Sequence, residues 1–188
     1  MTSRNSELRK ELDLLTTPPE SLTAASPAAA WEAWLAEQVR NIAELAGTHP
    51  HSIRLHTQGT PAERRNCFAI ALGLDPEATF GSGSYVAPGS KFVRDLCKSR
   101  ILERKVMAPS EAAETDILIY LDGVCPRHAG KWDNGKVISK WGHGPTHVWK
   151  HALWDLPESY GHDVGVFRPI SQPAVVKAYE MLAEHRRF

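Results

Sequence analysis

The sequence predicts an α+β fold in which helices come first and an antiparallel sheet follows. From Trp31 to Leu45, apolar residues recur at the spacing of a helix that buries one face. After residue 115 the pattern changes, because residues 116–121 form a largely apolar run that is typical of a buried strand. The turn motif Asp133-Asn134-Gly135 then separates two strand-like segments and predicts a β-hairpin. Helices followed by paired strands make up the α+β class.

The first fifty residues predict a helical segment. Leucines at helical spacing within residues 6–16 indicate a short amphipathic helix. Ser26-Pro27 supplies an N-cap and a first-turn proline for a second helix, and Gly47 is placed to end it. We therefore expect an N-terminal helical segment over residues 1–50 and the main domain over residues 51–188.

The helix around Cys67 has two plausible starting points. Thr60, Pro61 and Glu63 match a capping box, which would place Cys67 in the second turn. Alternatively, Asn66 is the cap and Cys67 opens the helix. We favour the second start, because it places the thiol where the helix dipole is felt most strongly.

The rest of the chain alternates loops with short elements. In chain order, the sequence predicts a short strand at residues 52–56, a surface loop at 75–90, a helix from Ser90 to about residue 102, hairpin strands at 128–132 and 136–141, an irregular segment at 142–161, a strand at 164–167 and a helix opened by Pro173.

Charge and composition argue against several classes of protein. Basic and acidic side chains number 22 each, so no excess of positive charge favours nucleic acid. No apolar run approaches the length needed to span a bilayer, and the charged N-terminus does not resemble a secretion signal. Three cysteines, an odd number, do not suggest a disulfide framework. We expect a protein that binds neither nucleic acid nor membranes and is cytoplasmic, or exported without a signal peptide.

Cys67 and His128 form the candidate catalytic pair. A cysteine at the start of a helix is favoured as a thiolate by the helix dipole. His128 stands at the head of the first hairpin strand. Because a cysteine nucleophile needs a base that takes its proton and later returns it, we expect His128 to act as base and then as acid. This chemistry requires no cofactor.

Three motifs follow one another along the chain: Asn66-Cys67-Phe68-Ala69, the strand at residues 116–120, and His128-Ala129-Gly130. Their order resembles that of the papain-like NlpC-type cysteine peptidases and amidases. The similar region covers roughly residues 60–142. Further motifs, Ser139-Lys140-Trp141-Gly142, His151 and Tyr160-Gly161, are similar to those of small uncharacterised bacterial members of that group.

The resemblance implies both a fold and a reaction. It implies a papain-like domain with the nucleophile helix packed on an antiparallel sheet, and hydrolysis of an amide bond through a thioester. The implied partner is a peptide, protein or cell-wall substrate. A protein glutamine deamidase or an acyltransferase toxin of the same fold is the alternative. A toxin would have an immunity or inhibitor protein as a further partner.

The chain departs from the family pattern at the third catalytic residue. In that family a polar residue after the hairpin turn orients the histidine, but the aligned residue here is Lys140, which cannot accept an imidazole N–H. Ser139, Lys140 and His151 are the candidates for this third position. Backbone N–H groups at the start of the nucleophile helix, with Gln58 and Asn66, are the candidates for an oxyanion hole.

A metal site is a rival prediction. His143, His147 and His151 recur every four residues, so a helix through this segment would present three imidazoles on one face, a set suited to zinc. Pro145 makes a helix improbable at the first histidine but leaves it open from Thr146 onward.

A catalytically inactive binding module is the other rival. In this interpretation Trp141, Trp149 and Trp154 line a recognition surface, and Cys67 has ordinary thiol reactivity.

Overall fold

The computed structural model describes residues 3–23, 25–60, 62–75, 86–142 and 145–184. Its helices are α1 (Ser3–Thr16), α2 (Ala28–Leu45), α3 (Cys67–Ala71), α5 (Ser90–Lys98) and α6 (Gln172–Glu184), with 3-10 turns η1 (Pro109–Glu111) and η2 (Glu158–Tyr160). Its strands are β1 (Arg54–Thr57), β2 (Leu102–Lys105), β3 (Ile117–Asp122), β4 (Cys125–Asp133), β5 (Lys136–Lys140), β6 (Val148–His151) and β7 (Asp163–Pro169). This arrangement confirms the predicted α+β class.

The described strands form one seven-stranded sheet in the order β1-β6-β5-β4-β3-β7-β2. Every neighbouring pair is antiparallel. The predicted β4–β5 hairpin is present, and its turn has positive φ angles of 48° at Asn134 and 81° at Gly135. A type I′ turn needs positive φ at both central residues, so the Asn-Gly pair fixes the register of this hairpin.

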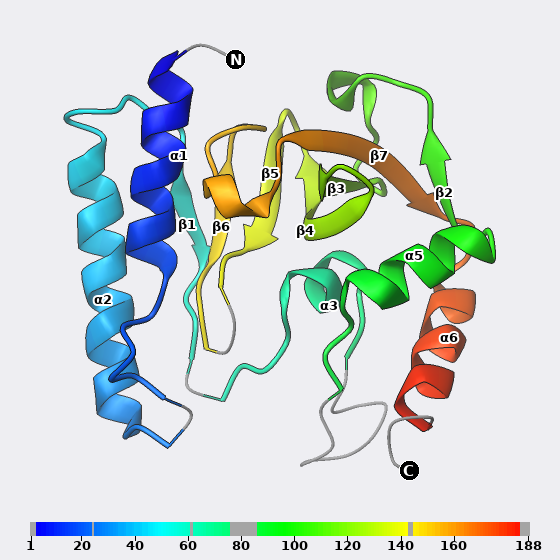
Figure 1. Cartoon of the computed structure of the whole chain (residues 1–188), viewed down its shortest axis with the longest axis horizontal. Coiled ribbons are helices and arrows are strands. Elements are labelled where there is room, and N and C mark those ends of the chain that lie inside the picture. The colour runs from blue at the N-terminus through cyan, green and yellow to red at the C-terminus, as the bar shows by residue number, and fades with distance from the viewer. Residues whose placement is uncertain (1–2, 24, 61, 76–85, 143–144, 185–188) are drawn as a thin grey trace.

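Helices cover both faces of the sheet (Figure 1). One core joins Leu8 and Leu12 of α1 and Ile42 of α2 to Leu118 and Tyr120 of β3. The opposite core joins residues of α3, α5 and α6 to the alternate residues of β3, which are Ile117, Ile119 and Leu121. Because successive strand residues point to opposite faces, a strand buried on both sides reads as one continuous apolar run.

The sequence missed two strands. Residues 142–161, expected to be irregular, contain β6, which pairs with both β1 and β5. The prediction of a helix through His147 and His151 is therefore wrong. The helix expected to reach about residue 102 ends at Lys98, and the chain continues into the edge strand β2. Most of the predicted loop at residues 75–90 lies outside the described residues.

None of the described helices is long and apolar enough to cross a membrane.

Candidate functional site

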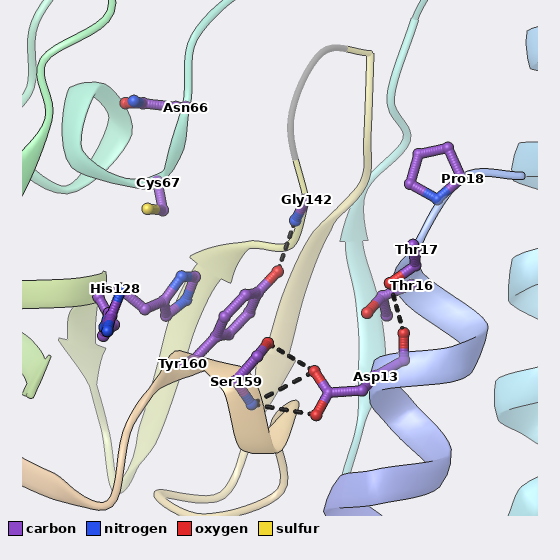
Figure 2. Close-up of a pocket in the computed structure, with 11 residues that line it drawn as sticks. Asp13, Thr16, Thr17, Pro18, Asn66, Cys67, His128, Gly142, Ser159 and Tyr160 are labelled. Atoms are coloured by element: carbon purple, nitrogen blue, oxygen red, sulfur yellow. Dashed lines mark hydrogen bonds between the residues drawn. The ribbon is translucent and has the colours of Figure 1, made fainter. Parts of the chain in front are cut away.

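A cavity of about 240 Å³ lies where α1, α3, β4 and η2 meet (Figure 2). Asp13 and Thr16 line it from α1, Cys67 from the start of α3, His128 from β4 and Tyr160 from η2. The two residues of the predicted catalytic pair therefore line the same cavity. Figure 2 shows the Cys67 side chain directed from α3 toward the strand that carries His128.

Asn66 fixes the start of the nucleophile helix. Its Oδ1 accepts the backbone N–H of Ala69 at 2.9 Å, and its Nδ2 donates to the carbonyl of Pro88 at 2.7 Å. The cap of α3 is thus Asn66, and Cys67 is the first helical residue, as the favoured prediction had it. A side-chain cap of this kind satisfies one of the N–H groups that a helix start leaves without a partner.

Burial dominates the electrostatics of the Cys67 thiol. Backbone N–H groups of Ala129, Phe68 and Cys67 itself lower the pKa of this thiol, as does the positive charge of Lys140. Loss of hydration outweighs these effects and raises the pKa to about 11. The resting sulfur is therefore a protonated thiol, which differs from the thiolate expected from the helix dipole.

His128 is buried within β4, with 1% of its surface exposed, and does not stand at the strand's first residue. Its ring stacks on Tyr160, with centroids 4.0 Å apart and planes 8° from parallel, and it is tilted against Tyr120 at 5.7 Å. Its Nε2 is buried and has no hydrogen-bond partner among the described residues. Burial lowers the pKa of His128 well below 6.5, so the resting imidazole is neutral and able to accept a proton.

Ser139 and His151, two candidates for the third residue, bond to each other. The Nδ1 of His151 donates to the carbonyl of Ala152 at 2.7 Å, so its Nε2 accepts from the Ser139 hydroxyl at 2.9 Å. Trp141 Nε1 donates to the same hydroxyl at 3.0 Å. These groups form a satisfied network inside the core, and a positive charge on His151 would lower the pKa of His128.

Lys140, the remaining candidate for the third position, is fully buried. Its Nζ has no hydrogen-bond partner among the described residues. Lys140 therefore lies beside the site, but its ammonium group cannot accept and orient an imidazole N–H.

The two side-chain candidates for the oxyanion hole are placed differently. Gln58 is exposed and is not among the described residues that line the cavity. Asn66 lines the cavity, but its amide group is engaged in the α3 cap and in the bond to Pro88. The backbone N–H groups of Cys67 and Phe68 precede the first intrahelical bonds and interact with the Cys67 sulfur, so they lie where donors to an oxyanion are needed.

His147 and His151, two histidines of the rival metal site, form hydrogen bonds within the fold. His147 accepts the Gly59 N–H at its Nδ1, at 2.9 Å, and donates from its Nε2 to the carbonyl of Leu35 at 2.9 Å. His151 also has both ring nitrogens bonded, and His143 lies outside the described residues. Among the described side chains, no group of three or more metal-ligating residues is arranged to hold an ion.

The rival prediction, that three tryptophans line a recognition surface, is wrong for two of them. Trp141 and Trp149 are 0% and 2% exposed, because both pack in the core under α1 and α2. Trp154 is only partly buried, but it packs against the same core.

The sequence analysis missed the part played by α1 and η2. Arg9, 1% exposed, donates from its guanidinium to the carbonyls of Leu156 at 3.1 Å and Gly161 at 2.5 Å, which lie on either side of η2. Asp13 accepts from the backbone N–H of Ser159 at 3.0 Å and from its hydroxyl. These bonds hold η2, and with it Tyr160, against His128. The leucine stripe of α1 shows that the helix buries a face, but nothing in the sequence identifies what that face covers.

Comparisons of the chain with protein-family models, with curated proteins and with solved structures found no match. The likeness to NlpC-type enzymes therefore rests on the sequence motifs, and the function has to be argued from the site.

Proposed function

We propose that the protein is a cysteine hydrolase that cleaves an amide bond, with Cys67 as nucleophile and His128 as base, in a papain-like, NlpC-type arrangement. One observation carries the proposal. A cysteine at a capped helix start and a buried neutral histidine with an unpartnered ring nitrogen line the same cavity. A buried polar atom without a partner is costly, and a catalytic role is one of the reasons such an atom is retained.

The reaction begins with the proton on Cys67. His128 takes the thiol proton, the sulfur bonds to the carbonyl carbon of the substrate, and the carbonyl electrons move to oxygen. As the tetrahedral intermediate collapses, the C–N bond breaks and the amine leaves with the proton from His128. A water molecule, deprotonated by His128, then attacks the thioester, releasing the acid and restoring the thiol.

The raised pKa of Cys67 fits a nucleophile that is activated only when substrate is bound. Because the resting thiol and imidazole are both neutral, the thiolate forms during the reaction rather than before it. The N–H groups of Cys67 and Phe68 would stabilise the oxyanion as it develops, since neither is needed for a helical bond.

The size of the cavity favours a small acyl group. A volume of about 240 Å³ is below the roughly 300–1,000 Å³ of sites that hold drug-sized ligands. One amino-acid side chain fits this space better than a long extended peptide. The same observation favours a second candidate reaction, deamidation of a glutamine side chain, which uses the identical thioester and releases ammonia. Peptides, proteins and cell-wall peptides all supply such amides.

Acylation by p-nitrophenyl acetate tests the nucleophile. We expect this activated ester to acetylate Cys67 faster than Cys97 or Cys125, as peptide mass spectrometry would show. In His128→Ala the rate at Cys67 should fall roughly 100-fold or more, the range for loss of a general base. The two other cysteines should be unaffected and serve as internal references.

Two outcomes would contradict the proposal. One is acetylation of Cys67 no faster than that of the other cysteines, and the other is a rate at Cys67 that does not depend on His128. If the dyad passes this test, coumarin amides of single amino acids distinguish a peptidase or amidase from a deamidase, which would instead release ammonia from glutamine peptides.

A further inference from the structure

Lys140 is a second unpartnered group beside the proposed nucleophile. It is 0% exposed, and its Nζ has no hydrogen-bond partner among the described residues. Burying an ammonium group without a partner is unfavourable by several kcal/mol. A strand residue with a purely structural role would not need this charge.

The register of the sheet places Lys140 next to Cys67. Strands β4 and β5 pair through Lys131 and Ile138. Continuing that register brings Lys140 opposite Ala129, whose backbone N–H is the group that does most to lower the pKa of the Cys67 thiol. Neighbouring β5 residues such as Val137 face the core under α1 and α2, so Lys140 faces the side of α3.

The charged groups around Lys140 come from the segment before α3. Glu63 and Cys67 raise the pKa of Lys140, Arg65 lowers it, and burial lowers it most, to about 8. Glu63 is bound to Arg65 at 2.8 Å, so its carboxylate is already shared with another cation. Tyr160 of η2 is a further titratable group that interacts with Cys67. At neutral pH, Lys140 is therefore mainly an ammonium ion, and the nearby groups that can carry negative charge are the Glu63 carboxylate and the Cys67 sulfur.

We propose that Lys140 is the cation that stabilises negative charge on the Cys67 sulfur as His128 removes the thiol proton. This role rests on the proposed function. Lys140 does not line the cavity, so it acts on the nucleophile through the buried protein rather than by touching substrate. Charges interact more strongly across a protein interior than across water, and a fixed cation there needs no reorganisation during the reaction.

Lys140→Met tests this role, with Lys131→Met as the matched control. Both positions lie on paired strands, but Lys131 is exposed. The readout is the rate of Cys67 acetylation by p-nitrophenyl acetate as a function of pH. We expect Cys67 acetylation in Lys140→Met to be roughly tenfold slower than in the wild type between the pKa of His128 and about pH 8. The control should match the wild type.

The shape of the pH profile separates an electrostatic role from a structural one. In the wild type, the rate should decline above about pH 8, where Lys140 loses its own proton. In Lys140→Met this decline should be absent. Lys140→Arg, which keeps the charge, should restore most of the rate. Replacing a buried charge by a methionine of similar volume does not usually destabilise a protein, so Lys140→Met should fold, as urea unfolding would verify.

The outcomes distinguish this inference from the proposed function. If Cys67 acetylation depends on His128 but the Lys140→Met profile keeps the wild-type position and shape, the inference about Lys140 is overturned and the nucleophile stands. If the wild-type Cys67 shows no dependence on His128, the proposed function itself fails, and the role of Lys140 fails with it.

Discussion

Two buried histidines on one face of the sheet differ in how they are bound. His128 and His151 are 1% and 0% exposed, and both lie on the face covered by α1 and α2. Both ring nitrogens of His151 are hydrogen-bonded, whereas Nε2 of His128 has no partner among the described residues. His128 is held instead by stacking on Tyr160, a contact that does not involve its Nε2.

The comparison separates a structural histidine from a candidate catalytic one. Burial alone lowers the pKa of both residues, so a perturbed pKa does not tell them apart. The difference lies in the hydrogen bonds. A satisfied network makes a core rigid and specific, while an unsatisfied nitrogen facing a cavity has its lone pair or proton available for a substrate or a nucleophile.

The strongest test replaces His128 by a residue that keeps its packing. His128→Phe should preserve the stack on Tyr160 while removing both nitrogens. We expect acetylation of Cys67 to fall by roughly 10²- to 10⁴-fold, the usual contribution of a general base. The free energy of unfolding should not fall, because the buried Nε2 has no hydrogen-bond partner among the described residues. If the variant keeps the wild-type rate, His128 is a structural residue, like His151.

The pH dependence of stability sharpens the comparison. The pKa of His151 falls from 6.5 to about 4 in the folded state, so between these values the unfolded chain binds more protons. Stability is therefore fully present above pH 6.5 and is lost as the pH falls toward 4, by about 3 kcal/mol from this group. His128 changes stability in the same direction. Urea unfolding over this range measures the loss, and a flat profile would show that His151 is not buried as a neutral imidazole.

Removing His151 should affect folding rather than catalysis. In His151→Phe the Ser139 hydroxyl loses its acceptor while remaining buried, which costs about 1–3 kcal/mol. Part of the acid sensitivity should disappear with the imidazole. Cys67 acetylation should stay within a few-fold of the wild-type rate. A large loss of rate in a variant of normal stability would instead assign His151 a place in the catalytic machinery.

Local patterns in the sequence account for much of the fold. The continuous apolar run of β3, the Asn134-Gly135 turn and the Asn66 cap are each encoded by adjacent residues. The strand β6 was missed because its four residues, Val148–His151, show no alternation of apolar and polar side chains and follow a segment with glycines and a proline. Its identity as a strand depends on pairing with β1 and β5, a long-range interaction.

The site was predictable only in part. Cys67 and His128 were found because a helix start and a strand have recognisable local signals. The wall formed by α1 and η2 depends on Arg9 and Asp13 reaching residues near position 159, and no local pattern encodes such contacts. The raised pKa of Cys67 was also beyond the sequence, because burial is a property of the folded chain.

The smallest expected effect concerns the group that holds His128. Tyr160 stacks on the imidazole, and its hydroxyl accepts the backbone N–H of Gly142 at 2.6 Å. Tyr160→Phe keeps the stack and loses this one bond, so unfolding should become easier by about 1 kcal/mol while Cys67 acetylation is unchanged. Tyr160→Leu removes the stack as well and should slow acetylation. Equal rates in Tyr160→Leu and Tyr160→Phe would mean that the stack does not position the base. In that case the position of His128 would be set by its strand alone.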